Sequence, residues 1–200
     1  MKRNPSIIGI AGASCSGKTL LANAIAQAIP AGDAAVIGLD SYYLDRAEGE
    51  QANLNFDDPA ALEKELLIEQ LQMLSNGESI EKPVYDYVSH GRQPQTELIQ
   101  ALRYIIIEGL HTLHWREIRS LLRLKVFIDV DHDTCLARRI ARDTKERGRT
   151  RASIMQQYRE TVRPMYDRFV YPTQKYADLL LDGSASVEDL TAILIGRLDL

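Results

Sequence analysis

The stretch Ile7-Ile8-Gly9-Ile10-Ala11-Gly12-Ala13-Ser14-Cys15-Ser16-Gly17-Lys18-Thr19 decides how the rest of the chain is interpreted. An apolar, β-branched run breaks at one glycine, and an Ala/Leu-rich helical pattern follows a second, so the motif G-x-x-x-x-G-K-[ST] lies between an expected strand and an expected helix. In this setting backbone N–H groups and the helix N-terminus bind phosphate. We therefore expect nucleotide contacts from Gly12, Ala13, Ser14, Cys15, Ser16, Gly17, Lys18 and Thr19. An ordinary glycine-rich turn is the alternative.

Two residues of this motif have specific roles in phosphoryl chemistry. The ammonium of Lys18 is expected on the β- and γ-phosphates of the nucleotide, and the hydroxyl of Thr19 on Mg²⁺. A Mg²⁺-linked acid is also expected where a strand ends near the loop. Glu108 ends one apolar run, and Asp129 and Asp131 lie at the end of another. Spacing alone does not choose among these carboxylates.

The composition argues against several classes of protein. The 200 residues suit one domain with a substantial core. A net charge of −4 argues against a surface that coats nucleic acid. No segment approaches the ~20 apolar residues that a membrane-spanning helix needs. Cys15 and Cys135 are far apart and in no metal-ligand spacing, which is typical of a reduced, cytoplasmic setting.

Five apolar runs predict the strands of a parallel sheet. They cover residues 7–11, 34–39, 104–107, 125–130 and 177–181, and they alternate with helical patterns at 18–29, 59–76, 132–148, 152–168 and 187–198. Strands and helices that alternate in this way give a three-layer α/β sandwich. We expect residues 1–200 to form a single domain, with an inserted substrate lobe at about 41–100 and a helical lid at about 138–160.

Two acidic residues early in the chain are candidates for the site. Asp40 follows the expected strand 34–39, and residues just beyond the carboxyl ends of strands form the ligand crevice of open α/β sheets. Its structural alternative is to cap a turn. Asp58 precedes Pro59 and fits a helix N-cap, which leaves Asp57 without a structural role.

Two further segments are open to two interpretations each. Residues 82–92 mix alternating aromatic and β-branched residues with His, Asp and Arg, and they fit either a ligand-contacting segment or the solvent edge of a hairpin. Residues 132–148 form a strongly basic helical pattern with interleaved acids. It is either a solvated face with salt bridges or a lid that carries arginines for phosphoryl transfer.

Taken together, these motifs resemble the uridine–cytidine kinase family, which is close to the phosphoribulokinases among the P-loop kinases. The most specific match is Pro83-Val84-Tyr85-Asp86-Tyr87-Val88-Ser89-His90, the nucleoside-base segment of the family. The other matches are Asp40-Ser41-Tyr42-Tyr43, Asn55-Phe56-Asp57-Asp58-Pro59, Glu108-Gly109, Ala137-Arg138-Arg139-Ile140-Ala141-Arg142-Asp143, Glu146-Arg147-Gly148-Arg149 and Pro172-Thr173-Gln174-Lys175-Tyr176-Ala177-Asp178.

The resemblance implies transfer of the γ-phosphoryl group of ATP, or of GTP, to the 5′-hydroxyl of uridine or cytidine. It implies Asp40 as the base that accepts the hydroxyl proton, and Thr19 with Glu108 at Mg²⁺. Arg142 and Arg147 would join Lys18 and Asp40 as catalytic residues by reaching the triphosphate from the lid. The implied substrate contacts are Asp57 and Arg139 at the ribose, and Tyr43, Tyr85, Tyr87, His90, Arg149 and Gln157 around the nucleoside.

The chain departs from the family pattern at a few positions. Cys15 stands where glycine is common, Tyr42 where phenylalanine is usual, and His111-Thr112-Leu113-His114 replaces a more apolar stretch. Glu-Gly-Leu-His also occurs in phosphoribulokinases, so ribulose 5-phosphate is an alternative acceptor. A nucleotide-dependent switch is an alternative of another class, although a guanine-specificity loop of Asn-Lys-x-Asp type does not occur in the sequence. The resemblance also implies small-molecule partners and a homo-oligomer, by expectation a tetramer, while the charge and the apolar segments described above argue against nucleic-acid and membrane partners.

Overall fold

The computed structural model describes residues 4–45, 55–86, 89 and 91–198. Five parallel strands form its central sheet, in the order β2-β5-β1-β6-β7. Their bounds are β1 (Ser6–Gly12), β2 (Ala34–Gly38), β5 (Tyr104–Glu108), β6 (Leu122–Asp129) and β7 (Leu179–Asp182). The central strand β1 pairs Ile8 with Ile106 on one side and with Leu124 on the other. The predicted five-stranded parallel sheet is confirmed.

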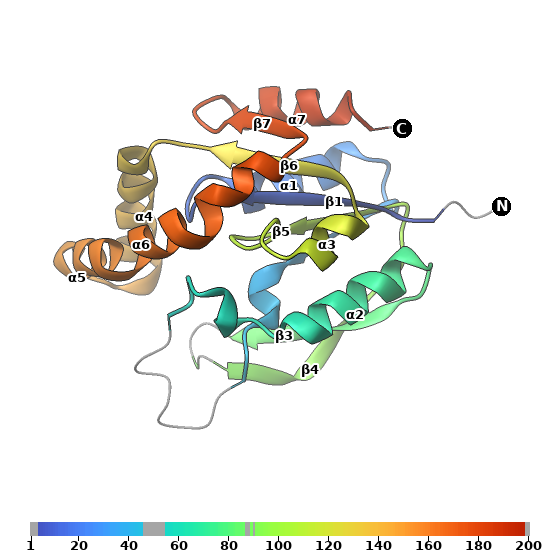
Figure 1. The fold of residues 1–200 in the computed structure, drawn as a ribbon, viewed down its shortest axis with the longest axis horizontal. Coiled ribbons are helices and arrows are strands. Elements are labelled where there is room, and N and C mark those ends of the chain that lie inside the picture. Colours follow the sequence, from blue (N-terminus) through green and yellow to red (C-terminus); the bar gives the residue numbers. More distant parts are fainter. Residues whose placement is uncertain (1–3, 46–54, 87–88, 90, 199–200) are drawn as a thin grey trace.

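Helices cover both faces of this sheet. Helix α1 (Lys18–Ala28) packs against α7 (Val187–Ile195), and α2 (Lys64–Ser75) packs against α3 (Arg116–Leu121). Figure 1 shows α1 behind the sheet and α3 in front of it, which gives the predicted three layers. Strand β1 is buried from Ile7 to Gly12 because both of its faces are covered. In the described residues, every helix is too short or too polar to cross a membrane.

The predicted helix 59–76 is interrupted in the structure. Asp58 caps a short 3-10 turn (Pro59–Ala61), and its carboxylate accepts the Ala60 N–H at 2.8 Å, so the predicted cap is confirmed. Leu62 is then extended and pairs with Tyr43 in an isolated bridge. The Glu63 N–H donates to the Tyr42 carbonyl at 2.8 Å. This pairing with a distant segment uses backbone groups that a continuous helix would need, so α2 begins only at Lys64.

A second sheet lies below the first in Figure 1 and consists of one antiparallel hairpin, β3 (Ile80–Asp86) and β4 (Gly91–Ile99). Strand β4 is largely exposed, with no alternation of buried and exposed side chains, which explains why no hydrophobic pattern marks it. Arg92 anchors the hairpin. Its Nε donates to the Tyr43 carbonyl at 2.9 Å, and its guanidinium also pairs with the Glu63 carboxylate. The hairpin is thereby fixed beside the segment that follows β2.

A long helical segment lies at the carboxyl edge of the main sheet, to the left in Figure 1. It contains α4 (His132–Arg147), α5 (Arg151–Gln157), a π-helical turn (Tyr158–Val162), α6 (Arg163–Met165), a second π turn (Tyr166–Val170) and a 3-10 turn (Tyr171–Tyr176). The predicted helix 132–148 is confirmed, and Gly148 ends it with φ 61°. At Pro164 the helix does not stop, because π turns on both sides accommodate the missing N–H.

Candidate active site

The loop between β1 and α1 has the backbone geometry that a phosphate site requires. Gly12 and Gly17 have φ of 149° and 101°, conformations that favour glycine. A side chain at Gly12 would also place its Cβ 2.6 Å from the Ile128 carbonyl oxygen. The Nζ of Lys18 donates to the Ala13 carbonyl at 2.6 Å, and the lysine side chain is buried. The ammonium is therefore held over the loop.

Cys15 occupies a backbone conformation that is unusual for its residue type. Among the described residues it is the one non-glycine with a positive φ, 65°. A left-handed conformation costs an L-residue roughly 1–2 kcal/mol, and glycine avoids this. The departure from glycine noted in the sequence therefore falls at a position where glycine would be less strained.

Candidate residues that are far apart in the sequence line one cavity of about 350 Å³. Lys18 and Thr19 come from α1, Asp40 from the turn after β2, Glu108 from the end of β5, and Arg142 from α4. The rest of the lining is Ser14, Cys15, Gly17, Leu20, Gly109, Leu110 and Arg138. The order of the parallel strands brings these groups together, because β5 lies between β1 and β2 with all carboxyl ends at one edge.

Thr19 and Glu108 form an oxygen pair that fits a hard cation. The Thr19 hydroxyl donates to Glu108 Oε1 at 2.9 Å. Burial raises the pKa of the Glu108 carboxyl, while the Lys18 charge opposes this rise. The described residues contain no cluster of three or more acidic, His or Cys side chains that could hold a metal by itself. Mg²⁺ characteristically takes one or two protein ligands and completes its shell with phosphate and water, so this pair fits Mg²⁺.

The competing carboxylates have structural partners. Asp131 caps α4, with its side chain accepting the Thr134 N–H at 2.8 Å. Asp129 accepts a hydrogen bond from the Gln174 side chain at 3.3 Å. Neither residue lines the 350 Å³ cavity.

Asp57 lies in the wall of a neighbouring cavity. Its side chain is buried, and burial raises the pKa of its carboxyl; the Arg139 charge acts in the opposite direction. His111 supports the backbone here, since its Nε2 lies 3.1 Å from the Asp57 carbonyl oxygen. The Asp57 carboxylate therefore lies among charged groups, and the imidazole of His111 holds its backbone carbonyl in place.

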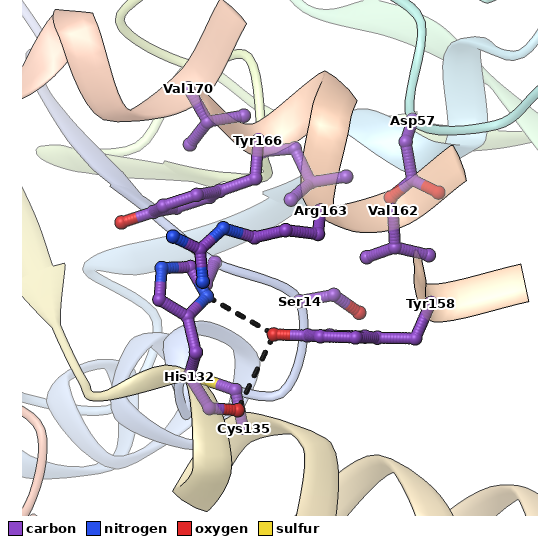
Figure 2. Close-up of a pocket in the computed structure, with 11 residues that line it drawn as sticks. Ser14, Asp57, His132, Cys135, Tyr158, Val162, Arg163, Tyr166 and Val170 are labelled. Atoms are coloured by element: carbon purple, nitrogen blue, oxygen red, sulfur yellow. Dashed lines mark hydrogen bonds between the residues drawn. The ribbon is translucent and has the colours of Figure 1, made fainter. Parts of the chain in front are cut away.

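Figure 2 shows this neighbouring cavity, whose walls include Ser14, Asp57, His132, Tyr158 and Tyr166. The Tyr158 hydroxyl lies 3.1 Å from His132 Nδ1 and donates to the His132 carbonyl at 3.3 Å. The cavity encloses about 10 Å³, about the least space that can hold a single water molecule. It is too small for a nucleoside in this conformation.

The predicted nucleoside contacts divide into two groups. Tyr43 and Tyr85 lie together with ring centroids 5.3 Å apart, and Phe56 packs edge-on against Tyr43 at 5.0 Å. Phe56 was not predicted as a site residue, although it precedes Asp57 directly in a motif that was recognised. Tyr87 and His90 lie outside the described residues.

The second group joins the phosphate loop to the helices at the carboxyl edge. Arg139 donates to Ser14 Oγ at 3.2 Å and to Gln157 Oε1 at 3.2 Å. Arg149 donates to the same Gln157 oxygen at 2.5 Å. Arg147 lies near Asp143 instead, at 3.6 Å, and does not line the 350 Å³ cavity. Asp143 was missed because a carboxylate among arginines in a helix usually indicates an exposed ion-pair face.

The Tyr42 departure also has a structural explanation. The Tyr42 hydroxyl donates to Gln70 Oε1 at 2.7 Å, and the Gln70 amide donates to the Glu81 carbonyl at 2.9 Å. Burial raises the pKa of the Tyr42 hydroxyl. The hydroxyl therefore connects the turn after β2, through α2, to β3.

Comparisons with known proteins show the family to which this sequence is similar. The sequence model of the Phosphoribulokinase / Uridine kinase family matches residues 7–189. A uridine kinase from Staphylococcus haemolyticus (strain JCSC1435) is 40% identical over 186 residues, which are 92% of this chain and 90% of that protein. A uridine kinase from Staphylococcus aureus (strain JH9) is 41% identical over 184 residues, 90% of this chain and 89% of that protein.

Solved structures of low sequence identity share the fold. Phosphoribulokinase from Rhodobacter spheroides has a TM-score of 0.66 at 18% identity, covering 92% of this chain and 74% of that one. A structure described as a possible uridine kinase from Bacillus stearothermophilus has a TM-score of 0.67 at 19% identity, covering 91% of each chain. The resemblance seen in the sequence is thus confirmed, and the chain belongs to the phosphoribulokinase / uridine kinase family of kinases.

Proposed function

We propose that this protein is a nucleoside kinase that transfers the γ-phosphoryl group of ATP, or of GTP, to the 5′-hydroxyl of uridine or cytidine. One observation carries the proposal. Lys18, Thr19, Asp40 and Glu108 line a single cavity of about 350 Å³. In our proposal these residues act as a phosphate-binding ammonium, a cation-binding oxygen pair and a proton acceptor. The relatives named uridine kinase, about 40% identical, support the substrate class.

Asp40 is the group that we assign to the acceptor hydroxyl. It lies in the turn after β2 and lines the same cavity as Lys18. A carboxylate here accepts the 5′-hydroxyl proton as the oxygen attacks the γ-phosphorus. Little covalent help is available in phosphoryl transfer, so the main contributions are in-line positioning and neutralisation of charge.

We assign the positively charged side chains near the cavity to the phosphate groups of the nucleotide. Lys18 contacts the β- and γ-phosphates, and Arg142 and Arg147 reach the triphosphate when the segment 138–160 closes as a lid. Thr19 and Glu108 would hold Mg²⁺, which would supply positive charge that offsets the charge of the phosphates. Closure also excludes water, which would otherwise hydrolyse the nucleotide.

The nucleoside contacts follow from the groups next to this cavity. Asp57 and Arg139 are assigned to the ribose hydroxyls, and Arg149 and Gln157 to the edge of the nucleoside. The aromatic side chains Tyr43 and Tyr85, with Tyr87 and His90, are assigned to the base. The aromatic contacts belong to an inserted lobe at about 41–100. A buried polar group left unpaired costs about 1–3 kcal/mol, so we expect 2′-deoxynucleosides to be poor substrates.

An assay of nucleoside diphosphate release, ADP from ATP or GDP from GTP, across a panel of acceptors tests the proposal. The panel contains uridine, cytidine, thymidine, adenosine and ribulose 5-phosphate, each with ATP and with GTP as donor. We expect turnover with uridine and cytidine and little with the other acceptors. Turnover with ribulose 5-phosphate alone would reject the nucleoside assignment and retain the kinase. Slow nucleotide hydrolysis that no acceptor accelerates would favour a nucleotide-dependent switch.

A further inference from the structure

Asp143 is a fully buried carboxylate at the centre of the arginine-rich helix α4. Its side chain is 0% exposed, and four guanidinium groups surround it. Arg142 Nε donates to its Oδ1 at 2.9 Å. The other nitrogen–oxygen distances are 3.6 Å from Arg139, 3.6 Å from Arg147 and 3.8 Å from Arg149. All four arginines are among the residues assigned above to the nucleotide or the nucleoside.

The backbone of Asp143 organises the same region. Its carbonyl oxygen accepts the N–H of Gly148, where α4 ends with φ 61°, and the N–H of Arg149 at 3.1 Å. One residue therefore fixes the end of the helix, the turn after it and the start of the segment that carries Arg149. Side-chain and backbone contacts act on the same set of arginines.

Charge balance indicates that this cluster is more than a structural ion pair. A carboxylate removed from water must be paired, but one guanidinium would be enough for neutrality. The four guanidinium groups outnumber the carboxylates that act on them, which are Asp143, Asp57 and Glu146, so an excess of positive charge remains. Arg139 also bonds Ser14 of the phosphate loop, and Arg142 lines the adjoining cavity. The excess charge thus lies beside the site where the anionic nucleotide would bind.

We propose that Asp143 is a positioning residue that holds Arg139, Arg142, Arg147 and Arg149 as one ordered set before the nucleotide binds. The inference rests on the function proposed above, in which these arginines contact the substrates. Ordering long side chains in advance reduces the entropy lost on binding and in the transition state. Asp143 itself, being buried by the arginines, acts through them.

Asp143→Asn tests the inference, because the amide keeps the shape of the side chain and removes the charge. We expect kcat to fall about 10- to 100-fold, the range expected for catalytic groups displaced by about 1 Å or less. Glu146→Gln is the matched control. Glu146 is an exposed acid on the same helix that also acts electrostatically on Arg142, so this variant removes a nearby charge without removing the buried centre. We expect Glu146→Gln to retain the wild-type kcat.

A double-mutant cycle with Arg142→Ala distinguishes positioning from general destabilisation. If Asp143 acts through Arg142, Asp143→Asn lowers kcat much less in the Arg142→Ala background than in the wild type. Additive losses would refute the inference while leaving the function intact, and so would a lower melting temperature with an unchanged kcat of the folded enzyme. A wild-type kcat in Arg142→Ala would refute the role proposed for this arginine in the reaction, and the inference with it.

A measurement on the wild-type protein keeps the inference testable if Asp143→Asn does not fold. Nitrogen-15 relaxation reports the order of each arginine Nε–H in the protein without nucleotide. We expect order parameters for Arg139 and Arg142 near those of rigid backbone, about 0.85. Values below about 0.6, typical of mobile groups, would overturn the inference.

Discussion

The buried His111 makes the stability of this protein sensitive to acid in a way that can be calculated. Its side chain is 1% exposed, and its Nε2 lies 3.1 Å from the Asp57 carbonyl oxygen. A carbonyl can only accept, so Nε2 carries the hydrogen and Nδ1 of the neutral ring is bare. Burial, together with the charges of His114 and Lys18, lowers the pKa of His111 to about 3, although the bond to Asp57 opposes this effect.

The sign of the effect follows from proton binding in the two states. An unfolded histidine has a pKa of about 6.5, so between that pH and about 3 the unfolded chain binds a proton that the folded chain does not. The contribution of His111 to the free energy of unfolding is therefore fully present above pH 6.5 and is lost as the pH falls. The loss is about 1.4 kcal/mol for each pH unit, or about 2 kcal/mol at about pH 5.

The variant His111→Gln separates this effect from the titration of other groups. Glutamine can donate toward the Asp57 carbonyl but does not titrate. The difference in unfolding free energy between wild type and variant should change by about 2 kcal/mol between about pH 7.5 and about pH 5. Urea denaturation followed by Trp115 fluorescence measures it, because this residue is the one tryptophan of the chain and its ring lies 6.0 Å from His111.

His132→Gln is the control for the histidine prediction. Burial also lowers the pKa of His132, but its side chain is only partly buried, so its pH-dependent contribution should be smaller. Stability curves of wild type and His111→Gln that run parallel from about pH 7.5 to about pH 5 would show that His111 titrates normally. That result would contradict the reasoning from burial.

Three further predictions concern the chemistry of the site. Asp40→Asn should lower kcat about 10²- to 10⁴-fold and leave nucleotide affinity, measured by calorimetry, nearly unchanged; a wild-type kcat would reject the base assignment. Arg142→Ala and Arg147→Ala should reduce kcat more than they raise the nucleoside KM, since their charge matters most as the γ-phosphoryl group transfers; wild-type kinetics in both would leave only a solvated helix face. A thiol-alkylating reagent should label the part-exposed Cys15 and spare the buried Cys135, whose pKa burial raises to about 11. ATP with Mg²⁺ should slow the labelling of Cys15, and mass spectrometry that finds equal rates would reject this contact.

Features that depend on neighbours in the sequence could be predicted from it. The apolar runs identified all five strands of the main sheet. The signal is strongest for β1 and β5, because strands buried on both faces contain few polar residues. Asp58 and Gly148 mark helix ends through contacts within a few residues, and the structure confirms them. The phosphate-loop motif likewise determines its own backbone, since its glycines adopt their conformations locally.

Features that depend on distant partners needed the tertiary structure. The break before α2 arises from pairing with residues 42–44, and the exposed strand β4 is held by its partner β3 rather than by a pattern of its own. The order of the strands in the sheet cannot be read from the sequence, and it brings Glu108 Oε1 within 2.9 Å of the Thr19 hydroxyl. Asp129 and Asp131 form hydrogen bonds with other residues instead. The roles of these residues, and the lobe and lid boundaries, stay predictions for the experiments above.

The arginine-rich helix α4 shows most clearly how far the sequence alone can predict this region. Its sequence predicts that Asp143 lies among positive charges, because residues three and four apart share a helix face. Whether that helix face is exposed or buried depends on the segment after Gly148, which places Arg149 and Gln157 beside α4. A carboxylate in water contributes little through its ion pairs, whereas a buried one requires them. The sequence alone therefore determined that Arg139, Asp143 and Arg147 share one helix face. The tertiary structure brought Arg149 to that face and buried Asp143, and a buried carboxylate requires its ion pairs.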